Sequence, residues 1–391
     1  MASISLCMIV KNEEYVLERC LESVRSLADE IIIVDTGSTD RTREIAKKYT
    51  DRIYEIPWKD DFAWARNFSF SKAKMDFCMW LDADDVIDEE NRKKFKKVKE
   101  SLSWKTDVVM MKYAAAFNES GEPVFSYYRE RLLKNDGSFQ WEGRVHEAIV
   151  PHGEILYTDV EIFHKKEKDG EAGRNLRIYE KMISEGRKLV PRELFYYGRE
   201  LYYNGRKEEA AEVLQAFLQG PGGWLENKIE ACKTLSDCYR ESGNDEEALA
   251  ILFRSFAMDV PRAEICCQIG LWFQERERWK EAAFWYKTAL QAEKKEENGG
   301  FIQEECYGFL PAVNLCLCYD KLGDISTAYK FHKMAAKIRP HAKEVEWNEA
   351  YFQKLQEEVE GNESSCLSGQ GRYRPGRKEH AKDHGRTGCD R

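Results

Sequence analysis

Residues 4–35 read ISLCMIVKNEEYVLERCLESVRSLADEIIIVD, and this stretch decides the fold of the first part of the chain. Residues 4–10 form a short apolar run, which is typical of a buried strand. The segment 13–27 then places apolar residues at helical spacing, namely Leu17, Cys20, Leu21, Val24 and Leu27. A second apolar run at 30–34 predicts another strand. The stretch therefore predicts a strand–helix–strand unit.

The same alternation continues beyond this unit. Helical patterns at 40–48 and 62–72 alternate with apolar strands at 52–56 and 77–81. A βαβαβαβ order predicts a mostly parallel sheet with helices on both faces. Sheets of this kind bind ligands at the carboxyl ends of their strands. We therefore expect an α/β domain with a Rossmann-like sheet over residues 1–170 and chemistry at the strand ends.

From about residue 175 the strand-like runs disappear and a helical repeat begins. Its four segments are LYYNGRKEEAAEVL (201–214), CYRESGNDEEALAIL (238–252), WFQERERWKEAAFWY (272–286) and CYDKLGDISTAYKFH (318–332). Each has an aromatic residue, then a turn, then an alanine five residues after the turn residue. The turn residues are Gly205, Gly243, Glu277 and Gly323, and the alanines are Ala210, Ala248, Ala282 and Ala328.

These segments resemble tetratricopeptide repeats, whose unit is about 34 residues. Glycine permits the tight turn, and a small alanine is needed where two helices cross closely. The chain departs from the pattern at Glu277, which replaces a glycine, and in an insertion at 294–300. We expect an all-α repeat domain over 171–358, followed by a disordered tail over 359–391, which is poor in large apolar residues.

The composition narrows the class of protein. Of the 391 residues, 42% are hydrophobic and 34% are charged, as in a folded globular protein, and the formal net charge is −9. A net acidic chain disfavours nucleic acid as the main partner. No run of 18 apolar residues occurs, and the N-terminus lacks the basic leader of a signal peptide. We expect a cytoplasmic protein whose twelve cysteines are reduced and buried.

Polar clusters follow the first two predicted strands. Val10, Asn12 and Glu13 come at the end of the first, and Asp35 and Ser38 come at the end of the second. An aspartate at a strand end can accept a hydrogen bond from a base or ribose, and the Gly/Ser/Thr turn after Asp35 lets a ligand approach. Taken alone, this turn is better explained as a helix N-cap.

A third cluster carries carboxylates. Asp82, Asp84 and Asp85 follow the fourth strand, and two carboxylates two residues apart can both reach one hard cation such as Mg²⁺ or Mn²⁺. An acidic loop capping the next helix is the alternative. Arg66 and Asn67 lie in the preceding helical segment, where Arg66 can pair with a phosphate or be a plain surface residue.

Taken in order, four of these segments resemble the inverting family 2 glycosyltransferases of the GT-A fold. The segments are SLCMIVKNEE (5–14), EIIIVDTGSTD (30–40), FAWARN (62–67) and WLDADD (80–85). The resemblance covers roughly residues 3–165. The chain is most similar to the subgroup that combines this domain with tetratricopeptide repeats, which includes bacterial enzymes that glycosylate cysteine or serine of peptides, such as the sublancin-type S-glycosyltransferases.

The resemblance implies a nucleotide-sugar site. Asp35 would hold the uracil or ribose, with Ser38 beside it, and the first loop with Val10, Asn12 and Glu13 would line the nucleotide. Arg66 and Asn67 match a motif that lines the donor site of the family.

The resemblance also implies a metal, Mg²⁺ or Mn²⁺, on the sugar diphosphate. Asp82 and Asp84 would hold it, with Ala83 between them at the donor. His164, at the end of the strand-like YTDVEIFH, resembles the histidine that completes this metal site. Asp85 would face the acceptor or the sugar.

The segment WEGRVHE (141–147) resembles a G-x-V-H-E motif of the same subgroup. Its Glu147, with His146 beside it, is the candidate for activating the acceptor, since an inverting transfer needs a base to take the acceptor proton. The usual acidic residue of other family 2 enzymes has no obvious copy here.

The implied partners are a nucleotide-sugar, with a UDP-sugar as the default, and a peptide, protein or cell-surface glycan as acceptor. The repeats favour a peptide or protein by analogy, and Trp272, Trp279 and Trp285 suggest a surface for a homo-oligomer. Two alternatives stay open. One is a non-catalytic scaffold, and the other is a sugar nucleotidyltransferase, which is disfavoured because the first loop lacks the glycines of a phosphate loop.

Overall fold

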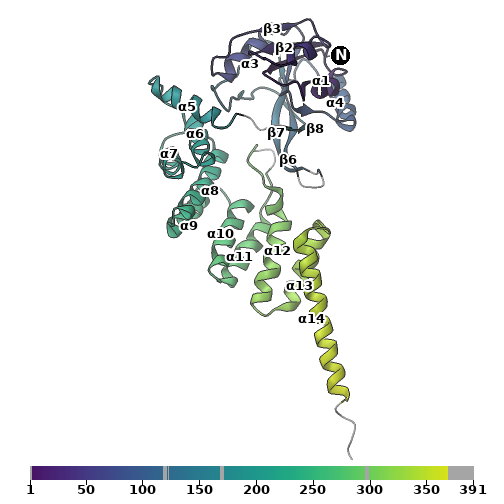
Figure 1. Cartoon of the computed structure of the whole chain (residues 1–391), viewed down its shortest axis with the longest axis vertical. Coiled ribbons are helices and arrows are strands. Elements are labelled where there is room, and N and C mark those ends of the chain that lie inside the picture. The colour runs from purple at the N-terminus through teal and green to yellow at the C-terminus, as the bar shows by residue number, and fades with distance from the viewer. Residues whose placement is uncertain (1, 118–120, 122, 168–170, 296–298, 369–391) are drawn as a thin grey trace, which may run out of the picture.

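A computed structural model describes residues 2–117, 121, 123–167, 171–295 and 299–368. It contains a sheet flanked by helices, followed by a curved stack of helices (Figure 1). This is the α/β-then-all-α architecture that the sequence predicts. Among the described residues, no helix combines the length and the apolar character needed to cross a membrane.

The sheet has eight strands in the order β3-β2-β1-β4-β7-β6-β8-β5. The first four in the chain are parallel, at the predicted positions. Their bounds are Ile4–Val10 for β1, Glu30–Asp35 for β2, Ile53–Glu55 for β3 and Phe77–Trp80 for β4. The others are Asp85–Val86 for β5, Val108–Phe117 for β6, Pro123–Lys134 for β7 and Ile155–His164 for β8.

The sheet is mixed, with four of its seven strand pairings parallel. β7 runs antiparallel to both β4 and β6, and β5 runs antiparallel to β8. The sequence pattern did not predict these reversals because the region after β4 lacks the regular strand–helix alternation that requires parallel crossovers. The short β5 matters most, since its pairing places Asp85 opposite His164.

Alternation along β1 and β2 sends apolar side chains to both faces of the sheet. Ile4, Leu6 and Met8 pack with helices α1 and α4, whereas Cys7 and Ile32 pack on the face of α3. The helices are α1 Leu17–Val24, α2 Thr42–Ala46, α3 Phe62–Phe70 and α4 Glu89–Ser101. With both faces covered, the edge at the carboxyl ends of β1, β2 and β4 is left for a site.

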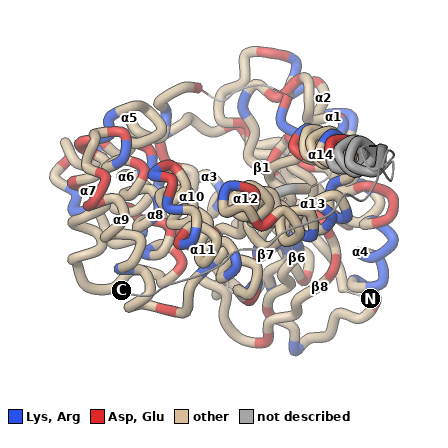
Figure 2. Tube along the Cα trace, turned by 90° about the horizontal axis from the view of Figure 1, so that it is seen from below, with Lys and Arg blue, Asp and Glu red and all other residues tan. Residues whose placement is uncertain are grey.

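The second part of the chain stacks helical hairpins. Contacts are extensive within α6–α7, α8–α9, α10–α11 and α12–α13. The bounds are α5 Arg174–Ser184, α6 Pro191–Tyr203, α7 Lys207–Gln219, α8 Leu225–Glu241, α9 Asp245–Arg254, α10 Ala263–Glu275, α11 Trp279–Gln291, α12 Phe309–Lys321, α13 Ile325–Ile338 and α14 Lys343–Ser368, with 3₁₀ turns at Ser255–Ala257 and Glu304–Tyr307. Figure 2 shows that Lys/Arg and Asp/Glu both recur along these helices.

The repeat positions read from the sequence have the expected roles. All four turn residues have left-handed backbones, with φ of 78° at Gly205, 76° at Gly243, 55° at Glu277 and 78° at Gly323. The four matching alanines are completely buried. Glu277 therefore keeps the turn that glycine makes in the other repeats, at a conformation that is uncommon for a residue with a Cβ atom.

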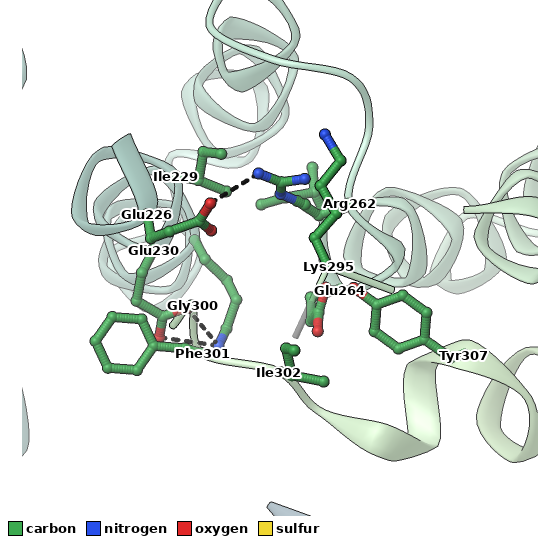
Figure 3. A pocket seen from close by; sticks show the side chains of 12 residues that line it. Glu226, Ile229, Glu230, Arg262, Glu264, Lys295, Gly300, Phe301, Ile302 and Tyr307 are labelled. Atoms are coloured by element: carbon green, nitrogen blue, oxygen red, sulfur yellow. Dashed lines mark hydrogen bonds and ion pairs between the residues drawn. The ribbon is translucent and has the colours of Figure 1, made fainter. Parts of the chain in front are cut away.

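The insertion after α11 lies against the inner helices (Figure 3). Phe301 packs on Phe195 of α6, with ring centroids 6.0 Å apart. The backbone N–H of Gln303 donates to Glu264 of α10 at 2.8 Å, and the Tyr307 hydroxyl donates to the same carboxylate at 3.1 Å. The inserted segment thus packs against α6 and α10 and lines a small pocket with α8 and α10 (Figure 3).

Three expectations need revision or comment. Helix α14 continues to Ser368, so the first residues of the predicted 359–391 tail are helical, and residues 369–391 lie outside the described ones. Trp272 is buried, and Trp279 and Trp285 are half-buried against the same core, so they give no support to a surface for oligomerisation. The ten cysteines with described side chains are all buried and unpaired, as expected.

Candidate functional site

A cavity of about 800 Å³ opens where the strands β1 and β4 end. The loops after these strands, α3, the loop before β8, the end of β8 and the first helix of the stack surround it. Its lining includes Val10, Asn12, Glu13, Arg66, Asp82, Ala83, Asp84, His146, Glu147 and His164. The structure therefore brings together residues that are up to about 150 positions apart in the sequence. Asp35, Ser38, Asn67 and Asp85 are not among the lining residues.

The loops after β1 and β2 are tied to each other. β1 and β2 pair with Val10 opposite Asp35, which brings the two loops together. Asn12 has a left-handed backbone, with φ of 56°, and its N–H donates to Ser38 Oγ at 2.9 Å. The Asn12 side-chain oxygen accepts from the Thr39 N–H at 2.8 Å. The two loops thus form one rigid wall, and Ser38 braces it from behind.

Asp35 holds the turn that follows β2. Its Oδ1 accepts from the backbone N–H groups of Gly37 at 2.9 Å and Ser38 at 2.8 Å. Its Oδ2 is buried and has no partner among the described residues. A buried carboxylate oxygen without a donor is costly, so this atom is suited to accept a hydrogen bond from a ligand.

Asp84, Asp85 and His164 form a cluster of the kind that holds a metal ion. Their ligand atoms all lie within 4.8 Å of one another. His164 Nδ1 is 3.3 Å from Asp84 Oδ1 and 3.4 Å from Asp85 Oδ1. The pairing of β5 with β8 creates this arrangement, and the sequence pattern could not reveal it because β5 has only two residues.

Two carboxylates and one imidazole fit a divalent cation such as Mn²⁺ or Mg²⁺. Burial alone would lower the pKa of His164, but the hydrogen bonds and charges of Asp84 and Asp85 raise it to about 10. The site thus attracts positive charge, and a metal ion would replace the imidazole proton. The sequence predicts Asp82, Asp84 and His164 as the metal ligands. The cluster in the structure contains Asp84 and His164 as well, but its third member is Asp85 and not Asp82.

Asp82 is instead paired with Arg66. Arg66 Nη2 donates to Asp82 Oδ1 at 2.7 Å, and Arg66 Nε donates to Glu147 Oε1 at 2.6 Å. The guanidinium also packs against the rings of Trp80 and Trp141, 5.0 and 4.8 Å from their centroids. Burial alone would raise the pKa of Asp82, but the charge of Arg66 lowers it to about 2.

Arg66 is therefore a buried cation at the floor of the cavity. Burial alone would lower its pKa, but Asp82 and Glu147 raise the pKa well above its ordinary value. Its Nη1 is buried without a partner among the described residues. This leaves the N–H groups of Nη1 for a ligand oxygen, which is the arrangement expected of a group that contacts phosphate.

The resemblance implies that Asp85 faces the acceptor or the sugar. In the structure, Asp85 is not among the residues that line the cavity. It is fully buried, its Oδ2 pairs with Arg131 at 3.1 Å, and its Oδ1 accepts from the Tyr113 hydroxyl at 3.0 Å. Oδ2 also accepts from the Asp82 N–H at 3.0 Å, which fixes the acidic loop. Asp85 is thus a buried member of the metal cluster.

Asn67 is not among the residues that line the cavity. Its amide side chain pairs with the backbone of Trp141, donating at 2.9 Å and accepting at 2.8 Å. This pair holds the segment 141–147 against α3. Asn67 therefore supports the segment that carries Glu147.

His146 turns toward the helical stack. Its Nε2 lies 2.7 Å from Glu200 Oε1, and its ring stacks on Tyr196 of α6 at 4.2 Å. Burial alone would raise the pKa of Glu200, but hydrogen bonds from His146 and Asn175 lower it. The structure thus places His146 at the junction with the stack as well as at the cavity.

Several cavity residues were not predicted. Arg129 of β7 lies with its guanidinium 4.7 Å from the Trp80 ring, and Arg174 and Arg177 reach the cavity from α5. For Arg129, the sequence did contain a signal. Arg129 and Arg131 alternate in the strand-like segment YYRERLL, and an arginine in an otherwise apolar strand requires acidic or aromatic partners. The α5 residues gave no signal, because they belong to the other predicted domain.

Comparison with known proteins agrees with this geometry. Residues 5–172 match the model of glycosyl transferase family 2. These residues form a family 2 glycosyltransferase domain.

Known relatives extend the match beyond this domain. The SPbeta prophage-derived glycosyltransferase SunS of Bacillus subtilis is 30% identical over 229 residues, which cover 54% of this chain and 52% of SunS. The lipopolysaccharide core biosynthesis glycosyltransferase LpsC of Rhizobium meliloti is 30% identical over 39% of this chain and 58% of LpsC. A TPR repeat-containing protein of Synechococcus elongatus is 47% identical over 22% of each chain. The chain spans about half the length of SunS.

Proposed function

We propose that this protein is an inverting glycosyltransferase that moves a sugar from a nucleotide-sugar, with UDP-sugar favoured, to a peptide or protein acceptor. The observation that carries the proposal is the cluster of Asp84, Asp85 and His164 beside the Arg66–Asp82 pair, in a cavity at the strand ends of a family 2 domain. This is where an α/β sheet binds a nucleotide.

The chemistry needs charge neutralisation on the leaving diphosphate. A Mg²⁺ or Mn²⁺ ion held by Asp84, Asp85 and His164 would supply it. Arg66, whose Nη1 has no partner among the described residues, adds a fixed positive charge at the same floor. Because Arg66 is held by two carboxylates and two indole rings, little reorganisation accompanies the reaction.

The nucleoside would bind against the wall formed by the first two loops. Asp35 Oδ2 offers a buried acceptor for an N–H or O–H of the base or ribose. Asn12, Glu13 and Val10 line the cavity in front of it. Displacing the sugar in one step then requires that the acceptor approach from the opposite side of the anomeric carbon.

Glu147 is the candidate base for the acceptor. It lines the cavity, and its Oε1 is held by Arg66 at 2.6 Å. The fixed Oε1 orients the carboxylate, so Oε2 is the atom that would take the acceptor proton as the new glycosidic bond forms. Arg66 also donates a hydrogen bond to Asp82 of the acidic loop. One arginine thus links the acidic loop, where the donor would bind, to the candidate base for the acceptor.

The helical stack lies beside the cavity and contributes Arg174, Asn175 and Arg177 to its lining. An acceptor bound in this cavity therefore lies beside the first helix of the stack. A stack of helical hairpins presents a long surface that suits an extended peptide better than a small molecule. This supports a peptide or protein acceptor.

A donor screen tests the proposal. Nucleoside diphosphate release is measured for the full chain with each of several UDP-, GDP- and dTDP-sugars and Mn²⁺, with and without EDTA. We expect release from one nucleotide class, abolished by EDTA. A sugar nucleotidyltransferase would release pyrophosphate from a nucleoside triphosphate and sugar phosphate instead. A non-catalytic scaffold would bind a nucleotide-sugar in calorimetry yet release nothing, with or without peptide acceptors.

A further inference from the structure

The segment 141–147 is tied to α6 by three kinds of contact. His146 Nε2 meets Glu200 Oε1 at 2.7 Å. The His146 ring stacks on Tyr196, with an interplanar angle of 11°. The His146 carbonyl accepts from Arg192 Nε at 3.3 Å and Nη2 at 3.2 Å. Both the side chain and the backbone of one residue are thus held by the helical stack.

The next residue is tied to the catalytic floor. Glu147 pairs with Arg66, and Arg66 pairs with Asp82 of the acidic loop. His146 itself has a left-handed backbone, with φ of 50°. A residue with a Cβ atom keeps such a conformation only where its surroundings hold it there. The contacts with α6 are the surroundings that do so.

We infer that Glu200 and Tyr196 of α6 are positioning residues, which hold His146 and thereby aim Glu147 at the acceptor. The inference rests on the proposed function. In this account the stack does more than carry an acceptor, because it completes the geometry of the base. His146 acts through Glu147 rather than as a base itself, since its Nε2 is engaged by Glu200.

The surroundings of Glu200 support this role. Its side chain is only 13% exposed, and Oε1 also accepts from Asn175 Nδ2 at 3.0 Å. Asn175 comes from α5, at the edge of the cavity. Burying a carboxylate costs free energy, and apolar side chains would hold two helices together equally well. A buried carboxylate such as Glu200 is therefore better explained by a role in fixing the orientation of its partners.

Turnover is the first test. Glu200→Ala is expected to lower kcat by about ten- to a hundredfold, with the KM for the donor changed less than twofold, because a misaimed base affects the chemical step rather than nucleotide binding. Glu200→Gln keeps an oxygen for His146 and is expected to recover most of the loss. Glu275→Ala is the matched control, since Glu275 makes an ion pair with Arg240 inside the stack, away from the cavity.

A double-mutant cycle separates positioning from general damage. His146→Ala is expected to lower kcat as Glu200→Ala does, and the double variant should lose little more, because both act through one contact. If Glu200→Ala unfolds, His146→Ala gives the same test with α6 intact. A kcat for Glu200→Ala equal to that of the wild type, or losses that multiply in the double variant, would overturn the inference.

Hydrogen exchange tests the inference without any activity. The N–H of Ala148 donates to the Glu142 carbonyl at 3.0 Å, and the N–H of Phe62 donates to the Arg144 carbonyl at 2.9 Å. We expect both amides to exchange faster in Glu200→Ala than in the wild type and Glu275→Ala. Unchanged exchange would contradict the inference. Faster exchange in a protein that turns over no donor would contradict the proposed function alone.

Discussion

At the scale of single residues, the site depends on one buried arginine. Arg66 donates to both Asp82 and Glu147 through different nitrogens and packs against two indole rings. The planar guanidinium is the only side chain that can make this set of contacts, because lysine offers a single nitrogen. The sequence suggested that Arg66 contacts a phosphate, but it could not show that the same residue links the acidic loop to the candidate base.

Arg66→Lys is therefore expected to lower turnover by about a hundredfold while the chain stays folded. Lysine keeps the charge but cannot hold Asp82 and Glu147 at once. Steady-state kinetics and circular dichroism check this. The control is Arg25→Lys, which changes an exposed arginine on the far end of α1 that pairs only with Glu22 among the contacts described for it. Equal turnover of Arg66→Lys and wild type would contradict the role given to Arg66.

The same residue makes a prediction for stability. Arg66→Met removes the cation that Asp82 and the mostly buried Glu147 share, so it is expected to lower the free energy of unfolding by about 1–3 kcal/mol. Urea unfolding followed by fluorescence measures this change. A loss of less than about 1 kcal/mol would mean that the network contributes little to folding.

At the scale of elements, the first four strands and their helices follow from the sequence pattern. The apolar runs alternate with helical patterns, and each lies within a few residues of the predicted position. The two-residue strand β5 and the reversed β7 could not be predicted, because neither has a pattern of its own. For the same reason the metal cluster was predicted with Asp82 in place of Asp85.

The third repeat turn offers a clean stability test. Glu277 has φ of 55° where the other repeats have glycine. Glu277→Gly is expected to stabilise the chain by up to about 1 kcal/mol, because glycine adopts this conformation without strain. Thermal unfolding measures the change, with Glu293→Gly as a control just beyond α11. A loss of stability in Glu277→Gly would show that the glutamate side chain matters more than the turn.

The insertion after α11 makes a second prediction at this scale. Phe301 packs on Phe195 and lies 4.8 Å from the Arg199 guanidinium. Phe301→Ala is expected to destabilise the stack by about 2–4 kcal/mol. Chemical unfolding checks this, with Phe284→Ala as the matched control, since Phe284 is largely exposed. Equal losses of stability in Phe301→Ala and Phe284→Ala would mean that the packing of the insertion on α6 does not stabilise the stack.

At the scale of the whole molecule, the site belongs to both parts of the chain. The sequence predicted a donor domain and a separate repeat domain, and the order of the two is as predicted. It gave no sign that α5 lines the cavity or that α6 contacts His146, because contacts between distant segments leave no periodic pattern. The partition into residues 1–170, 171–358 and 359–391 stays a prediction, although the family 2 match ends close to the first of these limits.

Ligand binding should therefore stabilise the molecule in a metal-dependent way. UDP and Mn²⁺ together are expected to raise the melting temperature more than either alone, because the diphosphate completes the coordination of an ion that three side chains hold only in part. At a hundredfold excess over Kd the gain is about 2.7 kcal/mol. Differential scanning fluorimetry measures it. Equal shifts with and without Mn²⁺ would contradict the metal site.

The most direct measurement compares sugar transfer by the wild type, Asp84→Ala and Asp159→Ala, at saturating Mn²⁺ and with the donor found in the screen. Asp159 is an exposed aspartate on the same strand as His164, so its change tests for unspecific damage to β8. We expect Asp159→Ala to match the wild type and Asp84→Ala to lose at least about a hundredfold in kcat. Wild-type turnover by Asp84→Ala would contradict the account of this site as a metal-dependent glycosyltransferase centre.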